Sequence, residues 1–270
     1  MSIQKGFTRH SSNGVSFLTI PSFDRLGGVC CAFSTRIGGV SPKPYDSLNF
    51  SRKRENNPQN FSENLKRFGV AAGFDSTQSV GINYAHSAEV LRVYTGERGR
   101  GIIRDPLPQI CDGLCSDTKG LPLVSFHADC VPLFFYDPVR RAVAVCHAGW
   151  RGVAEHITQH AVHALADIGC KAQDIYAAVG PCISVKHFEV GHDVYELFRR
   201  TFGNAAALIR DGRFYVDLNS ACVSGMLQSG LKPAHITDAT LCTFGDAQLF
   251  FSHRRDRGQT GAMAAVIALL

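Results

Sequence analysis

The chain has 270 residues, of which 45% are apolar and 19% charged, so it can bury a core large enough for one sizeable domain. Its formal charge of +5, from 28 basic and 23 acidic residues, is mild, and its basic cluster at 51–54 lacks interleaved aromatic residues, so we expect no nucleic-acid binding. Residues 1–10 lack a signal-peptide core, and no apolar run approaches the roughly 18 residues of a membrane span, so we expect a cytoplasmic protein outside the membrane.

Apolar patterning predicts strands and helices that alternate without a strict βαβ rhythm. The expected strands cover 16–20, 29–34, 89–94, 121–126, 131–136, 142–146 and 175–179, with further apolar segments at 236–243, 249–252 and 263–269. The expected helices cover 61–68, Val153 to Gly169, 190–202 and 220–230. The sequence therefore predicts an α+β fold: a single domain over residues 1–270 with a mixed β-sheet and flanking helices, in which residues 1–15 form a loose extension.

The ten cysteines are expected to be free thiols or metal ligands, because disulfides are rare in the cytoplasm and no two cysteines form a Cys-x-x-Cys pair. Cys130 directly precedes the strand at 131–136, and His147 follows the strand at 142–146. Asp137-Pro138 between these strands indicates a turn, so a hairpin would bring Cys130 and His147 to the same end.

Three interpretations of this pair remain open from the residues. The pair can bind zinc with a further histidine, His86 or His127, and leave a fourth position open, as catalytic zinc sites do. We favour His86, because His127 would point to the opposite face of a regular strand from Cys130. Alternatively, Cys130 is a nucleophile for acyl transfer with His147 as its base. The third interpretation is that both residues are structural.

Residues 149–152 form a glycine-bearing turn into the next helix, where free N–H groups and Arg151 suit a phosphate. A tight structural turn with Trp150 in the core explains the same glycines. Further candidate cations are Arg36, beside a Gly-Gly turn, together with Arg254 and Arg255.

The chain resembles the bacterial laccase-domain (YfiH-like) family, once called polyphenol oxidases and now described as purine nucleoside phosphorylases. The matching segments, in order, are 33–41 (FSTRIGGVS), 45–49 (YDSLN), His86, 128–132 (ADCVP), 147–152 (HAGWRG), 180–181 (GP), 189–191 (EVG), 217–218 (DL), 242–243 (CT) and 251–255 (FSHRR). The run at 147–152 is the most specific of them. The chain departs from the family's usual pattern at Tyr84, Ser87 and Ala262, where Gln, Gly and Arg are usual.

The resemblance implies a zinc site made by His86, Cys130 and His147, with Asp129 as a candidate acid or base near the metal. It implies phosphorolysis of adenosine, inosine and methylthioadenosine, with a side activity that deaminates adenosine. The expected partners are purine nucleosides and phosphate, and the expected cofactor is Zn²⁺. Copper could occupy the same ligands in vitro.

A copper-dependent polyphenol oxidase is the alternative from another enzyme class, and a Cys130–His147 thiol hydrolase is a further one. Multicopper sites need clustered histidines, and blue copper adds a weak axial methionine. The sequence has no His-x-His pair and three methionines, Met1, Met226 and Met263.

Overall fold

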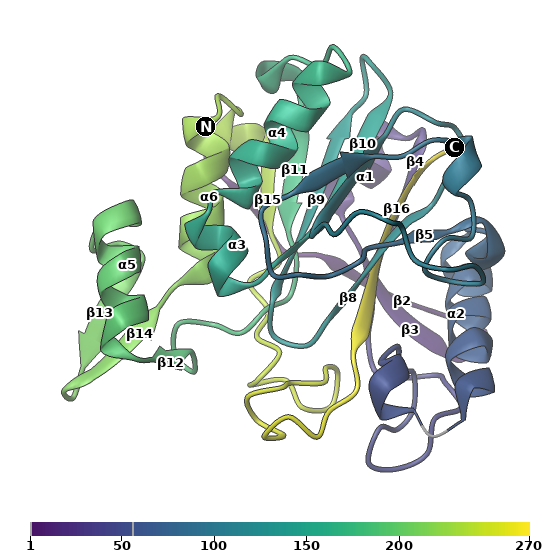
Figure 1. Cartoon of the computed structure of the whole chain (residues 1–270), viewed down its shortest axis with the longest axis horizontal. Coiled ribbons are helices and arrows are strands. Elements are labelled where there is room, and N and C mark those ends of the chain that lie inside the picture. Colours follow the sequence, from purple (N-terminus) through teal and green to yellow (C-terminus); the bar gives the residue numbers. More distant parts are fainter. Residues whose placement is uncertain (1, 56) are drawn as a thin grey trace.

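Two β-sheets stack face to face, and helices cover the outer face of each sheet (Figure 1). The computed structural model describes residues 2–55 and 57–270. The first sheet has the strand order β1-β15-β11-β9-β10-β7-β6. In chain order its strands are β1 (Gln4–Lys5), β6 (Val90–Arg92), β7 (Gly113–Ser116), β9 (Val131–Asp137), β10 (Ala142–Ala148), β11 (Tyr176–Val179) and β15 (Ile236–Asp238).

The second sheet has the order β2-β3-β4-β16-β8-β5. Its strands are β2 (Thr8–Ser12), β3 (Val15–Thr19), β4 (Val29–Ser34), β5 (Val80–Gly81), β8 (Leu123–His127) and β16 (Met263–Leu269). Both sheets are mixed, because β1, β15 and β11 run parallel, as do β6 with β7 and β5 with β8, while the other pairs are antiparallel. The expected α+β domain with mixed sheets and flanking helices is therefore confirmed.

The alternation of side chains along the central strands builds the layers. In β9, Leu133 and Phe135 pack toward the helices, whereas Phe134 and Tyr136 pack between the two sheets. Both faces of β9 and β10 are buried, which explains why these strands lack the alternation of apolar and polar residues seen in half-exposed strands.

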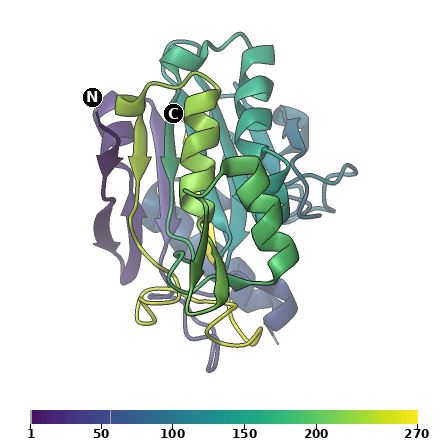
Figure 2. The ribbon, with the colours of Figure 1, turned by 90° about the vertical axis from the view of Figure 1, so that its left-hand side faces the viewer.

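The helices are α1 (Pro21–Leu26), α2 (Pro58–Ala72), α3 (Trp150–Ala154), α4 (Ile157–Asp167), α5 (His192–Phe202) and α6 (Leu218–Gln228). Helices α3, α4 and α6 pack over the first sheet, and α2 packs over the second (Figures 1 and 2). Helix α5 packs on a small third sheet of β12 (Glu189–Val190), β14 (Arg213–Val216) and β13 (Ala207–Arg210), which lies to one side in Figure 1. Among the helices of residues 2–55 and 57–270, none has both the length and the apolar character to span a bilayer.

Two expectations need correction. Residues 4–15 are not a loose extension, because β1 pairs with β15 and β2 pairs with β3. The helix expected from Val153 to Gly169 starts earlier and is two helices, because His156 takes a left-handed conformation with φ 62°. The apolar segment 249–252, for which no element was predicted, forms no strand and leads into a loop at the mouth of the site described below.

Candidate metal centre and active site

The hairpin of β9 and β10 brings Cys130 and His147 to one end of the first sheet, as expected. Ala148 pairs with Val131 and His147 with Pro132, so Cys130 lies just beyond the last strand pair, beside Gly149. His147 is 5% exposed, and Cys130 is half-buried. The two residues are 17 positions apart in sequence, and the register of a tight hairpin is enough to bring them together.

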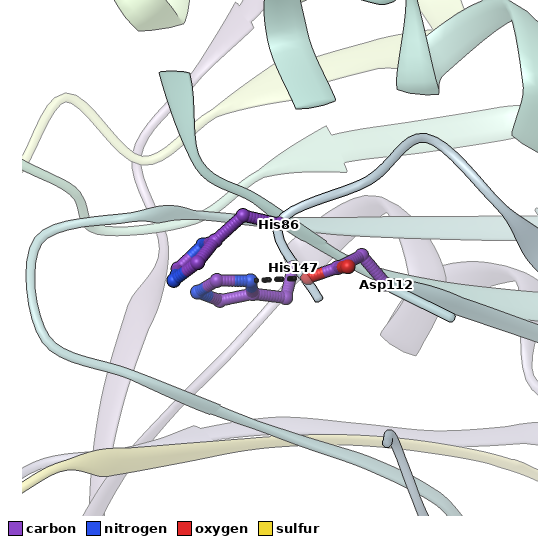
Figure 3. A group of neighbouring side chains, drawn as sticks. All are labelled: His86, Asp112 and His147. Carbon is purple, nitrogen blue, oxygen red and sulfur yellow. Dashed lines mark hydrogen bonds and ion pairs between the residues drawn. The ribbon is translucent and has the colours of Figure 1, made fainter. Parts of the chain in front are cut away.

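His86 reaches this point from the loop between β5 and β6. Its ring centroid lies 5.4 Å from that of His147, and the two rings approach each other in Figure 3. The backbone of His86 has a φ of 57°, an uncommon conformation for a residue with a side chain. The loop therefore holds His86 in a particular orientation at the end of the hairpin.

The three side chains converge on the space above Gly149. A Cβ atom at Gly149 would lie 3.1 Å from Nδ1 of His86, 3.5 Å from Sγ of Cys130 and 3.9 Å from Cε1 of His147. Glycine keeps this space open. Two imidazoles and a thiol form a donor set that suits zinc and leaves a fourth position for a water or substrate, so the residues fit the metal implied by the resemblance.

His127 lies close by, but both of its ring nitrogens have partners. Its Nδ1 lies 3.2 Å from the carbonyl oxygen of Cys130, and its Nε2 lies 2.7 Å from Oγ of Ser125. The carbonyl only accepts, so Nδ1 carries the proton and Nε2 accepts from the hydroxyl. This arrangement favours His86 over His127 as the third metal ligand.

Asp112, which the sequence analysis missed, lies on the far side of His147 (Figure 3). Its Oδ1 is 3.0 Å from Nδ1 of His147, and its carbonyl oxygen accepts the His147 backbone N–H at 2.7 Å. Oxygen and nitrogen atoms of His86, Asp112 and His147 lie within 4.8 Å of one another. Within residues 2–55 and 57–270, this is the one group of three or more His, Cys, Asp or Glu side chains so close together. Cys130 borders the same space at Gly149 but is not a member of this group.

The charges of this cluster shift the affinity of both histidines for protons. Burial alone would lower the pKa of His147, but the Cys130 sulfur and the Asp112 carboxylate raise it to about 9. Burial and the neighbouring His147 lower the pKa of His86. The negative groups around His147 that favour a proton there would favour a bound cation in the same way.

A hollow of about 300 Å³ opens over the three side chains. Its lining residues are His86, Ala128, Asp129, Cys130, His147, Trp150, Ile183, Phe188, Leu218, His253 and Arg254. A second hollow of about 550 Å³ shares Trp150, Phe188 and Arg254 with the first. Together they offer apolar and aromatic walls beside a comparable share of polar and charged groups, which suits a polar small molecule.

Asp129 lines the first hollow together with Cys130, although the two would face opposite ways in a regular strand. The chain is not a regular strand there, because Asp129 has a φ of 87°. Its Oδ1 accepts from Oγ1 of Thr243 at 2.6 Å, and its Oδ2 accepts from Oγ of Ser252 at 3.0 Å and from the Arg254 backbone N–H at 2.7 Å. The carboxylate therefore fastens the loop of residues 243–254 to the hollow.

The structure brings one of the four candidate arginines to the wall of this hollow. Arg254 lines it, held by a bond from Nη1 to the Glu189 carbonyl oxygen at 2.7 Å. Arg151 is exposed and stacks over Trp150, with its Cζ 4.4 Å from a ring centroid. The five-residue α3 begins at Trp150, so Arg151 lies within this helix.

Arg36 and Arg255 are engaged elsewhere. Arg36 lines a separate hollow, bonds the Asp46 carbonyl oxygen and stacks over Phe251. Arg255 donates to the carbonyl oxygens of Thr243 and Phe250 and pairs with Asp256. Neither belongs to the lining of the hollow over Cys130 and His147.

Comparisons with known proteins identify the relatives of this chain. The family model described as "Multi-copper polyphenol oxidoreductase laccase" matches residues 30–270. The chain is 35% identical over 238 residues to a protein of Deinococcus radiodurans named purine nucleoside phosphorylase, and the alignment covers 88% of each chain. It is 34% identical over 258 residues to "Purine nucleoside phosphorylase YfiH" of Escherichia coli, covering 95% of this chain and 100% of that one.

Solved structures show the same fold. The protein YfiH of Bacillus licheniformis superposes with a TM-score of 0.90 at 31% identity, over 98% of this chain and 99% of that one. YlmD of Geobacillus stearothermophilus gives a TM-score of 0.89 at 31% identity, over 97% and 98%. The chain belongs to the laccase-like family of YfiH and YlmD, whose curated relatives are named purine nucleoside phosphorylases.

Proposed function

We propose that this protein is a zinc-dependent purine nucleoside phosphorylase that cleaves adenosine, inosine and methylthioadenosine with phosphate and also deaminates adenosine. The observation that carries the proposal is the convergence of His86, Cys130 and His147 on the open space at Gly149. This convergence occurs in a chain whose relatives, at about one third identity, are named purine nucleoside phosphorylases.

The three side chains would hold the metal, which when bound supplies Lewis-acid chemistry to the hollow. Arg254 offers charge-assisted hydrogen bonds to a phosphate where the two hollows meet. Trp150 and Phe188 border both hollows and offer flat apolar surfaces to a purine. An oxygen of hydrogen phosphate held beside the ribose would form a bond to the anomeric carbon as the bond to the base breaks. The base leaves with that electron pair and takes up the proton that the hydrogen phosphate loses, so the products are the sugar 1-phosphate and the neutral base.

Asp129 contributes to this arrangement by holding its parts together. Its two oxygens accept three hydrogen bonds from the loop that carries Arg254, so one carboxylate fixes that loop against the segment that carries Cys130. We therefore assign Asp129 a positioning role for Arg254, in place of the acid–base role expected from the sequence. Arg151, outside the lining of the hollow, is retained as a weaker candidate for contact with phosphate.

A copper-dependent oxidation of phenols is the second candidate, favoured by the family's description alone. A multicopper enzyme needs several histidine-rich sites. Across the described residues, a single group of three metal-binding side chains has its atoms within 4.8 Å, and it contains two histidines. Two histidines in that group are too few for a multicopper centre, which weighs against the oxidase.

The test is product analysis of adenosine, inosine and methylthioadenosine incubated with zinc-loaded protein, with and without phosphate. We expect free base and the sugar 1-phosphate only when phosphate is present, and inosine from adenosine in either condition. Chelation should abolish both activities, and added zinc should restore them. Cys130→Ala should lose both, whereas Cys30→Ala should keep them, because Cys30 lies on β4 and bonds the Ala72 carbonyl oxygen.

Other outcomes would redirect the assignment. Cleavage that survives chelation but is lost on alkylation would indicate a thiol hydrolase. Phenol oxidation restored by copper alone, without nucleoside turnover, would indicate an oxidase. Inosine as the only product of adenosine, with or without phosphate, would reduce the function to deamination.

A further inference from the structure

We propose that Asp112 is the positioning residue of the metal centre: one carboxylate holds both histidine ligands in place and is not itself a ligand. The inference rests on the proposed function, because it takes His86, Cys130 and His147 as the metal ligands. Neither the sequence patterns nor the similarity to relatives assigns a role to Asp112.

Asp112 is fully buried, and both of its oxygens have partners. Oδ1 accepts from Nδ1 of His147 at 3.0 Å. Oδ2 accepts from the backbone N–H groups of Ala85 at 3.0 Å and Ser87 at 2.8 Å, and from Oγ of Ser87 at 3.2 Å. A buried carboxylate with four donors is satisfied without a metal, and binding a metal would cost it some of these bonds.

The bond to His147 determines which ring nitrogen faces the metal. Since the carboxylate only accepts, Nδ1 of His147 carries a proton and Nε2 is left for a ligand. Metal-binding histidines commonly donate their other N–H group to a carboxylate in this way, which fixes the orientation of the ring. The second bond, from the His147 backbone N–H to the Asp112 carbonyl oxygen, fixes the strand beneath the ring.

The bonds to Ala85 and Ser87 place His86. Both N–H groups point at the same oxygen, one on each side of His86, and the positive φ of His86 is what lets the chain curl around the carboxylate. Such a concave arrangement of N–H groups binds an anion. The conformation of the His86 loop therefore depends on a negative group at position 112.

One side chain thus couples two ligands that lie 61 positions apart, on β10 and on a loop. The hydroxyl of Ser87 donates a further hydrogen bond to the Asp112 carboxylate, at a position where the family usually has glycine. Asp112→Asn keeps the shape of the side chain but replaces one carboxylate oxygen by an –NH₂ group, which cannot accept a hydrogen bond. That group would face either Nδ1 of His147 or the donors of Ala85 and Ser87. The single oxygen of the asparagine can accept from His147 or from the loop that carries His86, but not from both.

The experiment is zinc affinity measured by competition with a chromophoric chelator, on folded protein well below its melting temperature. We expect Asp112→Asn to bind zinc about 10- to 100-fold more weakly than the wild type. Ser87→Ala should weaken binding much less, because both N–H groups remain. The matched control is Asp117→Asn, which removes an exposed carboxylate paired with Arg92 and should leave the affinity unchanged.

The location of zinc in crystals of the wild-type protein provides an independent test, whether or not Asp112→Asn folds. We expect the metal on His86, Cys130 and His147, with Asp112 outside its coordination sphere and still bonded to Nδ1 of His147. A carboxylate oxygen of Asp112 on the metal, or a folded Asp112→Asn with unchanged affinity, would overturn the inference and leave the proposed function intact. Zinc bound at none of the three proposed ligands would instead contradict the proposed function.

Discussion

Oδ2 of Asp129 accepts the backbone N–H of Arg254 at 2.7 Å and joins positions 125 residues apart. The same carboxylate accepts the hydroxyls of Thr243 and Ser252. The loop that carries Arg254 is therefore positioned by the residue that directly precedes Cys130. The two walls of the hollow cannot separate without breaking these bonds.

We predict that Asp129→Ala destabilises the protein by roughly 2–4 kcal/mol, because several buried donors lose their acceptor. Asp129→Asn should cost less, since asparagine tolerates a positive φ and retains one oxygen acceptor. Urea unfolding of both variants measures the free energy of unfolding. If Asp129→Ala were as stable as the wild type, the carboxylate would not be what fastens the loop.

Of the four candidate arginines, Arg254 lines the hollow, whereas Arg36 lines a separate one. We predict that Arg254→Ala raises the KM for phosphate about 10- to 100-fold, the loss expected when a hydrogen bond to a charged group is removed. Arg36→Ala should leave this KM near the wild-type value and instead lower stability, because the Arg36 guanidinium bonds the carbonyl oxygens of Asp46 and Ala247. Steady-state kinetics with varied phosphate distinguishes the two. The reverse order of effects would move the phosphate site to the hollow beside Arg36.

Much of the site could be predicted because its centre is local. Cys130 and His147 are joined by a hairpin whose apolar strands and Asp137-Pro138 turn are evident in the sequence. Asp112 could not be found this way, because it reaches His147 through the pairing of β7 with β10, and nothing in the β7 segment specifies that partner. The resemblance supported His86, but only the structure shows what holds its loop.

The errors have equally specific causes. A regular strand would turn Asp129 away from Cys130, but the positive φ of Asp129 bends the chain and brings both residues to the same hollow. β1 and β2 are polar and short, so no apolar alternation marks them, and their pairing with β15 and β3 depends on tertiary contacts. The interruption before α4 occurs at His156, a residue that does not usually end a helix.

Glu55 gives a pH-dependent prediction away from the hollow. Burial alone would raise the pKa of Glu55, but hydrogen bonds from Ser41 at 2.5 Å and Asn60 at 3.0 Å lower it below its ordinary value of 4.5. A lowered carboxyl pKa means that the folded state binds fewer protons than the unfolded state, so this contribution to stability is complete above pH 4.5 and is lost as pH falls through the folded value.

Glu55→Gln should therefore be less stable than the wild type at neutral pH, and the difference should shrink in acid. Urea midpoints at several pH values measure this, with Glu155→Gln as the control for loss of an exposed carboxylate. A difference that stayed constant across this range would mean that the charge of Glu55 is not what stabilises its contacts.

Gly149→Ala tests directly whether the metal ligands converge where the geometry puts them. Gly149 has φ −71° and ψ 165°, which alanine adopts without strain, so the fold should be kept and the metal-free protein should be as stable as the wild type. The new methyl group, however, would lie 3.1 Å from Nδ1 of His86 and 3.5 Å from Sγ of Cys130. We therefore expect weaker zinc binding and a smaller zinc-induced rise in melting temperature, because the stabilisation by a ligand follows its affinity.

The control is Gly96→Ala, at a glycine with open space around its Cβ position. Wild-type zinc affinity in Gly149→Ala would mean that the metal binds away from the space between His86, Cys130 and His147.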